Sequence, residues 1–457
     1  MEAKVDLTQG KVSGHVLRML GPFSLGVIAL VTTGIVDTIY LGRLTDEARP
    51  NLGVLALAAI GFAFPLTFAA KSACIGLGAG TMSAVSRAIG QGNMERARRH
   101  GAAAILLGLL AMSLLVSLLV LMMPGLLGLM GAEGEIMTMA QQYLIISFPG
   151  LIIVSVAMMS SNVLRAGGEA AVPSAIMITG ALINIVLDPF LIFGWGPFPR
   201  MEIAGAALAT AIGDTVSASL GFYVVFVHRK AVSFKEMTLG SIKRAWKVIG
   251  SVALPAAGTN IIVPASAAVL VTIIARNLTT IDVAAFTVAT RSELVSVGLL
   301  YALSACIGAI TGQNGGAGLT GRVREAFKFC YSICIIWSTF MALLLALFAP
   351  QIASIFTNDA QVIAKSIPYF YIVPITIFAY GFVFVSAAGF NALGRPFYGL
   401  AYTVVRSLIL MVGFVYIGVT LDGLRGAYIG IAAANLLSGA LAAGWSLTRA
   451  PMHAKKS

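Results

Sequence analysis

The stretch PFSLGVIALVTTGIVDTIYLGR, residues 22–43, shows the two features that decide the fold. It is predominantly apolar over about 20 residues, the length that a helix needs to cross a bilayer core of about 30 Å. It also aligns without gaps on PAAGTNIIVPASAAVLVTIIAR, residues 255–276, so the chain carries an internal repeat. The sequence therefore predicts an all-α membrane protein built from two related halves.

The composition excludes a soluble protein. The 457 residues are 58% hydrophobic and only 11% charged, whereas soluble proteins carry about 25% charged residues. So few charges cannot cover a soluble surface, which excludes a soluble enzyme and a nucleic-acid binder in spite of the net charge of +12. The N-terminus is polar and the first apolar run is long enough to span, so no cleavable signal peptide is expected.

Twelve apolar runs are long enough to cross a membrane. Because lipid offers backbone groups no other partner, each run is expected to be a helix. The runs are residues 14–41, 53–86, 101–123, 140–163, 172–194, 203–227, 247–275, 282–310, 327–349, 366–389, 396–420 and 424–447.

The basic residues predict the orientation of these helices. When the termini and every second loop are placed in the cytoplasm, 21 of the 30 Lys and Arg residues fall there and six in the opposite loops. Basic residues favour cytoplasmic loops, so we expect both termini on the cytoplasmic side of the inner membrane. Most of the basic charge is then an insertion signal and a contact with anionic lipid, rather than a ligand site.

The repeat predicts two lobes of six helices each. Beyond the opening stretch, Gly90-Gln91 corresponds to Gly312-Gln313. An even number of spans gives both halves the same orientation, related by an axis along the membrane normal, as in many transporters. We expect lobes at residues 1–227 and 247–457, joined by a basic cytoplasmic linker at residues 228–246.

Four polar residues of the first half lie at similar depth in their predicted helices. Asp37 lies toward the outer end of the first run, and Asp188 in the outer half of the fifth run. Asn184 is one turn from Asp188 on the same helix face, and Thr210 is about two turns into the sixth run. Ionisable residues within a membrane are costly and mark functional sites.

A proton-binding site is expected in the first half alone. Two carboxyl groups close together at low dielectric repel each other, so such a pair is expected to take up one proton and share it. We therefore predict a proton-binding site of Asp37 and Asp188, with Asn184 and Thr210 as hydrogen-bond partners. The corresponding residues of the second half are all apolar: Leu270, Phe414, Leu410 and Ile431.

Simpler interpretations remain open for these acids. Asp37 is near a helix end and could face the outer surface. Asp188 precedes Pro189, so it could mark a helix break and cap the next turn. Asp214 lies deeper, with Asn435 as its counterpart, and is either structural or part of the site lining.

Pro22 lies 15 residues before Asp37 in the first run. Proline removes a helix hydrogen bond and introduces a kink. It is either a hinge that couples protonation of Asp37 to bending of this helix, or a passive kink of the kind that membrane helices tolerate.

Other residues within the runs are candidates for an interface or a cavity. Glu293 lies opposite Lys71 or its neighbouring turn in the repeat, so we predict an ion pair between them; the alternative is an unrelated partner for each, Arg291 included. Flexible Met and aromatic side chains line sites that accept varied apolar ligands. Candidates for such a lining are Phe64, Met158, Met159 and Met177.

The cysteines predict no cofactor. All four lie in apolar stretches, and Cys330 and Cys334 are one helical turn apart. They could form a metal or redox pair, but no His or acid is near in sequence, and buried cysteine is common. We therefore expect no metal and no cofactor apart from the coupling ion.

The chain resembles the multidrug and toxic compound extrusion (MATE) family over its whole length. The resemblance rests on LAAIGFAFP at residues 57–65, GQGN at 90–93, LRAGGE at 164–169 and GQNGGAG at 312–318. The run from Asn184 to Pro189 and GAALAT at residues 205–210 are similar to the DinF-like, proton-coupled branch.

The resemblance implies the MATE fold, with twelve helices in two lobes, and a proton site in the first lobe. In the DinF-like branch that site is formed by an Asp of helix 1, an Asn and an Asp of helix 5 and a Thr of helix 6. These roles fall on Asp37, Asn184, Asp188 and Thr210, and the hinge-like proline of helix 1 falls on Pro22.

The sodium-coupled NorM-like branch places acids in the second lobe instead. Near the matching positions this chain has Val263 and Gly381, which argues against a second-lobe sodium site. Sodium at the first-lobe cluster is not excluded by this departure.

We expect a monomeric, proton-coupled antiporter that exports organic cationic or amphipathic compounds and contacts membrane lipids. The alternatives are a flippase for lipid-linked precursors or a sodium-coupled exporter. A flippase for anionic headgroups is expected to have several basic residues in its cavity, and only Lys71, Arg291 and Arg406 lie within spans. An intramembrane enzyme is disfavoured because no zinc motif, nucleophile elbow or acid-rich diphosphate motif is present.

Overall fold

In the computed structural model, the described residues are 6–47, 49, 52–235, 237–356 and 359–454. These residues form helices joined by short turns, and none of them lies in a β-strand. The all-α prediction is therefore confirmed.

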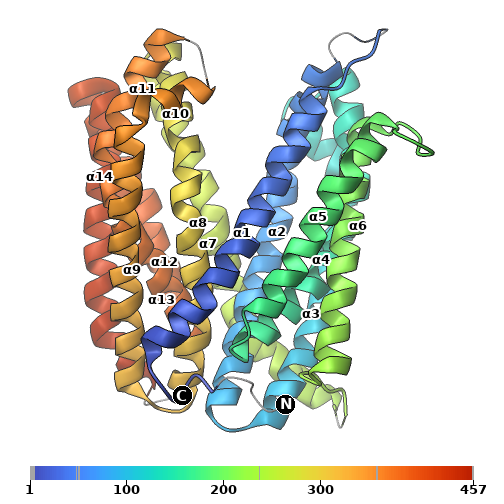
Figure 1. Ribbon diagram of the computed structural model, residues 1–457, viewed down its shortest axis with the longest axis vertical. Helices are drawn as coiled ribbons and strands as arrows, with labels where there is room; N and C mark the ends of the chain where they lie inside the picture. Colours follow the sequence, from blue (N-terminus) through green and yellow to red (C-terminus); the bar gives the residue numbers. More distant parts are fainter. Residues whose placement is uncertain (1–5, 48, 50–51, 236, 357–358, 455–457) are drawn as a thin grey trace. The chain divides into compact units, whose positions relative to one another are not determined.

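The helices of the first half are long and closely follow the predicted apolar runs (Figure 1). A short π-helix, η1, extends the sixth. The elements are α1 (Val12–Gly42), α2 (Leu52–Gly90), α3 (Met94–Leu129), α4 (Gly134–Ala166), α5 (Ala171–Phe193), α6 (Glu202–Tyr223) and η1 (Val224–His228); α7 (Leu239–Asn277) then begins the second half.

The helices of the second half are interrupted more often. The elements are α8 (Thr280–Gly316), α9 (Thr320–Leu347), α10 (Ala349–Phe356), α11 (Ala360–Ile372), the 3-10 helix η2 (Pro374–Thr376), α12 (Ile377–Ala392), α13 (Pro396–Val404), the π-helix η3 (Val405–Leu410) and α14 (Met411–Ala454).

Eleven helical segments of the described residues are long and apolar enough to cross a membrane. The last of these, Pro396–His453, contains the last two predicted spans. It is broken at Asp422 and Gly423, whose backbone angles are not helical, and glycine tolerates the φ of 55° found there. The fold is therefore the predicted twelve-helix membrane fold.

The chain divides into two compact units. The first unit contains Gly21–Val85 and Asn93–Ala257, and the second contains Asp6–Leu20, Ser86–Gly92 and Gly258–Ser457. Each of the helices α1, α2 and α7 therefore belongs partly to one unit and partly to the other. The lobe boundaries expected from the repeat stay a prediction.

Close packing of helices in the first unit positions its polar residues. Helices α4 and α5 both pack against α6. A Cβ atom added to Gly205 of α6 would lie 2.4 Å from the carbonyl oxygen of Leu191, and one added to Gly213 would lie 2.6 Å from that of Gly180. Because real Cβ atoms do not approach so closely, the two glycines allow the backbones of α5 and α6 to meet on either side of Thr210.

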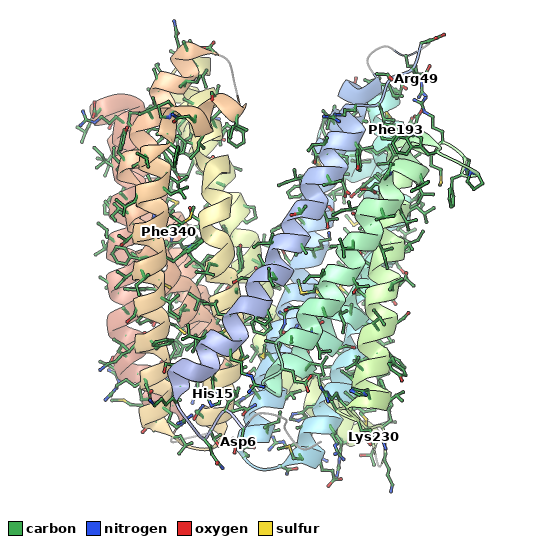
Figure 2. The ribbon with its side chains drawn as sticks, in the orientation of Figure 1. Asp6, His15, Arg49, Phe193, Lys230 and Phe340 are labelled. Atoms are coloured by element: carbon green, nitrogen blue, oxygen red, sulfur yellow. The ribbon has the colours of Figure 1, made fainter. Side chains whose placement is uncertain are left out.

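The two ends of the first unit carry different residues. Arg49 and Phe193 lie at one end of its helices and Lys230 at the other (Figure 2). At the Arg49 end, the guanidinium forms ion pairs with Asp46, Glu135 and Glu202. These contacts join the loop after α1 to the starts of α4 and α6.

Candidate functional site

A hydrogen-bonded group of polar residues lies between α5 and α6 of the first unit. The amide nitrogen of Asn184 lies 3.1 Å from the hydroxyl of Thr210 and 3.4 Å from a carboxylate oxygen of Asp188, and it donates to both. Asp188 is 0% exposed and Asn184 is 2% exposed. The structure therefore brings three of the four predicted site residues into one buried network.

Asp37 of α1 completes this group. Its carboxyl group interacts directly with that of Asp188 and also with the amide of Asn184. One oxygen each of Asp37, Asp188 and Asn184 is buried and accepts no hydrogen bond from any described residue. Ionised carboxylates only accept hydrogen bonds, so a single proton between the two acids would supply the missing donor.

The surroundings of the two acids bear on their simpler interpretations. Helix α5 continues through Pro189 to Phe193, so Asp188 does not mark a helix end. Asp37 is only partly exposed, and its Oδ1 atom is buried. The Asp188 carboxyl therefore lies in the interior of the first unit, and the Asp37 carboxyl is partly buried beside it.

Three further residues share the electrostatic environment of this site. Asp214 lies one turn beyond Thr210 on α6 and interacts with Lys71 and with Asp37. Lys71 of α2 also interacts with Asp37. The phenol of Tyr143 on α4 interacts electrostatically with all three acids. The second half of the repeat also has a tyrosine at this position, Tyr369, so a comparison of the two halves does not single out Tyr143.

The predicted ion pair between Lys71 and Glu293 stays a prediction. The side chains of Arg291 and Glu293 lie outside the described residues, although the backbone of α8 is helical there. Within the first unit, Lys71 is exposed and its described electrostatic partners are acids of the same unit.

The four candidates for an apolar lining differ in their surroundings. Phe64 is 61% exposed and stacks on Phe68. Met177 accepts a hydrogen bond from Arg165 through its sulfur. Met158 is partly buried beside the core, whereas Met159 is completely buried within the helix packing.

Pro22 lies within α1, which continues as a helix on both sides of it. The helix passes from the second unit to the first between Leu20 and Gly21, immediately before this proline. A hinge function for Pro22 stays a prediction.

All four cysteines are free and buried. No group of three or more His, Cys, Asp or Glu side chains with metal-binding geometry occurs among the residues that the structure describes. Cys330 and Cys334 lie on the buried face of α9.

The second unit fills the corresponding positions with a hydrophobic core. Leu270 and Ile431 are buried in one apolar cluster, and Leu410 and Phe414 pack against it. The polar network of the first unit therefore has no equivalent at these positions.

Membrane-length helices and a buried polar network define a polytopic membrane protein with a candidate functional site inside its first unit. The MatE family model matches residues 22–190 and 255–417, one match in each half of the chain. The chain therefore belongs to the MatE family, as its resemblance to MATE proteins implied. The DinF-like assignment stays a prediction.

Two named relatives match most of the chain. The chain is 31% identical to the FAD transporter of Shewanella oneidensis, covering 96% of this chain and 95% of that protein. It is 25% identical to the probable multidrug resistance protein NorM of Thermotoga maritima, covering 73% of this chain and 70% of the relative.

Solved structures share the fold. The crystal structure of the Vibrio cholerae MATE transporter VcmN in the bent form has a TM-score of 0.89 and 25% sequence identity, covering 96% of this chain and 98% of that one. The outward-facing conformation of a multidrug resistance MATE family transporter has a TM-score of 0.90 and 26% identity, covering 99% and 98%.

Proposed function

We propose that this protein is a proton-coupled antiporter that exports organic cationic or amphipathic compounds. The observation that carries the proposal is the contact between the carboxyl groups of Asp37 and Asp188, next to buried oxygens that lack a donor. Two carboxylates at low dielectric repel each other unless a proton lies between them, and membrane acids of this kind form proton relays.

The coupling follows from competition between two states. Protons bind the site from outside while substrate is released, and they leave the site when it faces the cytoplasm. Each ligand must favour a different state, because coupling between two ligands is reciprocal. In this scheme Asn184 holds the Asp188 carboxyl and Thr210 holds the Asn184 amide. Pro22 lets α1 bend, and Asp214 contributes to the site lining.

The setting that we propose is the inner membrane, with both termini in the cytoplasm. The excess of basic residues in alternate loops supports this orientation. We further propose that the protein functions as a monomer and uses the proton as its coupling ion, without a bound metal or cofactor.

The test is transport in vesicles with separately imposed ion gradients. The purified protein is reconstituted into vesicles that are loaded with a fluorescent organic cation. A proton gradient alone or a sodium gradient alone is then imposed across the vesicle membrane. We expect efflux only with the proton gradient. Efflux driven only by sodium would establish the sodium-coupled alternative, and failure of both gradients to drive efflux would reject cation antiport.

A second candidate substrate is an anionic aromatic dinucleotide such as FAD. The relative from Shewanella oneidensis that is a FAD transporter supports it. So does Arg406 of the second unit, which is only 5% exposed, donates two hydrogen bonds to Asn435 and lies over the ring of Tyr380. A buried guanidinium attracts anions and stacks on aromatic rings.

The same vesicles distinguish the two substrates. FAD release under a proton gradient, measured by flavin fluorescence, is compared with release of the organic cation. Release of FAD alone would identify an anion exporter that uses the same proton site. Lipid scrambling without release of either compound would instead indicate a flippase.

A further inference from the structure

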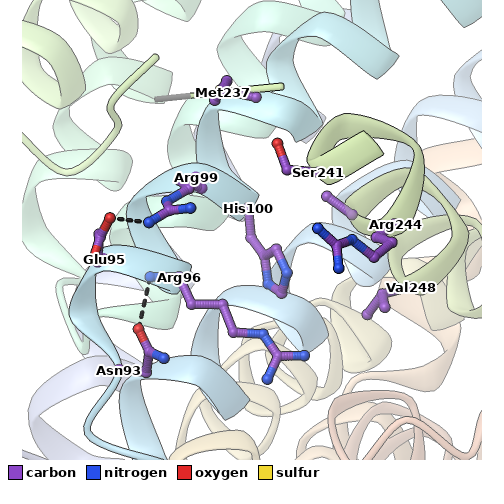
Figure 3. A pocket seen from close by; sticks show the side chains of 10 residues that line it. Asn93, Glu95, Arg96, Arg99, His100, Met237, Ser241, Arg244 and Val248 are labelled. Carbon is purple, nitrogen blue, oxygen red and sulfur yellow. Dashed lines mark hydrogen bonds and ion pairs between the residues drawn. The ribbon is translucent and has the colours of Figure 1, made fainter. Parts of the chain in front are cut away.

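A cavity of about 340 Å³ lies in the first unit, between the start of α3 and the start of α7 (Figure 3). One wall is the first two turns of α3, from Asn93 to His100. The other wall is the start of α7, including Ser241 and Arg244. The start of α7 thus lies beside the start of α3, with an open pocket between them.

The lining of this cavity is basic. Among the described residues of the lining, Arg96, Arg99 and Arg244 are basic and Glu95 is acidic. Glu95 forms an ion pair with Arg99 on the same helix. The described lining therefore holds more basic than acidic side chains, and a lining of this kind attracts anions.

The geometry directs this charge into the cavity. The side chains of Arg96 and Arg244 extend from the two walls toward the ring of His100 (Figure 3). His100 is 8% exposed, and its Nδ1 atom donates to the carbonyl oxygen of Ala84 at 3.2 Å. This hydrogen bond fixes the imidazole in the cavity wall.

Two helix N-termini add positive potential to the same space. Asn93 caps α3 by accepting a hydrogen bond from the backbone of Arg96 at 2.9 Å. At the start of α7, the backbone N–H of Ser241 donates to the hydroxyl of Thr238, and the hydroxyl of Ser241 accepts from the backbone of Thr238. The N-terminal ends of helices favour anions, and phosphate above all.

We propose that this cavity is a binding site for a phosphate group, which Arg96 and Arg244 hold between α3 and α7. Guanidinium groups bind phosphate oxygens through paired hydrogen bonds, and the volume accommodates a glycerol phosphate. Binding would tie the segment between the repeats to α3. The site goes beyond the transport function, and it gives these arginines a specific ligand in addition to their contribution to topology.

The experiment uses the full-length protein in nanodiscs and two matched double variants. R96Q/R244Q removes two arginines of the cavity. K243Q/K247Q removes the same charge from exposed positions of α7 that do not line it. Each variant is first checked for an unchanged thermal unfolding midpoint. If R96Q/R244Q does not fold, R96K/R244K replaces it, because lysine keeps the charge but loses the paired geometry.

Two measurements identify the source of the phosphate. In phosphatidylcholine nanodiscs, glycerol 3-phosphate is titrated and its Kd is measured. In nanodiscs that also contain phosphatidylglycerol, retained lipid is counted by native mass spectrometry. Charge-assisted hydrogen bonds predict at least about a tenfold loss of affinity in R96Q/R244Q, with little change in K243Q/K247Q.

Each outcome decides the proposal. Selective loss of glycerol 3-phosphate binding in R96Q/R244Q supports a site for a soluble phosphate compound. Selective loss of retained phosphatidylglycerol supports a site for a lipid headgroup. Equal behaviour of the two double variants in both measurements would overturn the proposal, because the charge would then act only through its total amount.

Discussion

The two repeats place opposite chemistry at equivalent positions. In the first unit, Asn184 donates to both Asp188 and Thr210 beside Asp37, and oxygens of this group remain buried without donors. In the second unit, the matching residues belong to or pack against a hydrophobic core. Orphaned buried oxygens destabilise a fold, whereas a packed core stabilises it. The difference supports a division in which the first repeat carries the coupling site and the second is optimised for packing at this depth.

The strongest test of this comparison is Asp188→Asn. The change keeps the shape of the side chain but removes the group that shares a proton with Asp37, so we expect proton-driven efflux to fall by about 100-fold or more. Asp37→Asn is expected to have the same effect, and the double variant should be no worse, because the two acids act as one unit.

Transport in reconstituted vesicles measures this effect, and the thermal unfolding midpoint serves as the control for folding. Full efflux by both single variants would show that the polar group of the first unit does not couple transport.

The next test exchanges the chemistry of the repeats. Leu270→Asn places a polar amide in the core of the second unit, and we expect a loss of about 2–5 kcal/mol in unfolding free energy. The reverse change, Asp37→Leu, removes a buried carboxylate and should leave stability unchanged or higher while abolishing transport.

Unfolding in mixed detergent micelles measures both variants of this exchange. Equal destabilisation by Leu270→Asn and Asp37→Leu would mean that the acid site is a structural element like the core.

Gly213→Ala tests how the site is assembled. The added Cβ would meet the carbonyl oxygen of Gly180 at 2.6 Å and would force α5 and α6 apart. We expect a loss of about 1–3 kcal/mol and a weaker contact between Asn184 and Thr210, with reduced transport.

Gly250→Ala is the matched control for this change, because no atom lies within 4 Å of its Cβ position and alanine favours helix. A stability loss of the same size in both variants would show that close approach of α5 and α6 is not what matters.

The smallest expected effect is that of Thr210→Val, which makes this position apolar, as Ile431 is in the second unit. The change removes one acceptor of the Asn184 amide but leaves Asp188 as the other. We expect a loss of about 0.5–1.5 kcal/mol and a several-fold slower efflux with proton coupling retained. Efflux and unfolding measured on the same preparation check this result, and complete loss of coupling would make Thr210 as essential as the acids.

Hydropathy predicted the fold because lipid permits few alternatives to a helix. The predicted runs correspond to the observed helices, including the last two, which non-helical backbone angles at Asp422 and Gly423 separate. The interruption of the tenth span by η2 at Pro374 was not predicted, nor was the short helix α10. Their bounds depend on local backbone geometry that an apolar run does not encode.

The asymmetry of the repeat identified Asp37, Asn184, Asp188 and Thr210 together. The same criterion overlooked Tyr143, because the second half has a tyrosine at the matching position, Tyr369. The surroundings of Lys71 depend on the rotation of α2 about its axis, which hydropathy does not determine. The basic cavity could not be predicted either, because it forms only where the starts of α3 and α7 lie side by side.

The division of α1 between the units has a consequence for biogenesis. The backbone N–H of Leu7 donates to the side chain of Gln313, and the carbonyl oxygen of Leu7 accepts from Asn314 and Arg322. The segment around Leu7 is therefore synthesised long before its partners exist. These partners lie in α8 and at the start of α9, so the second unit closes only when synthesis is well advanced.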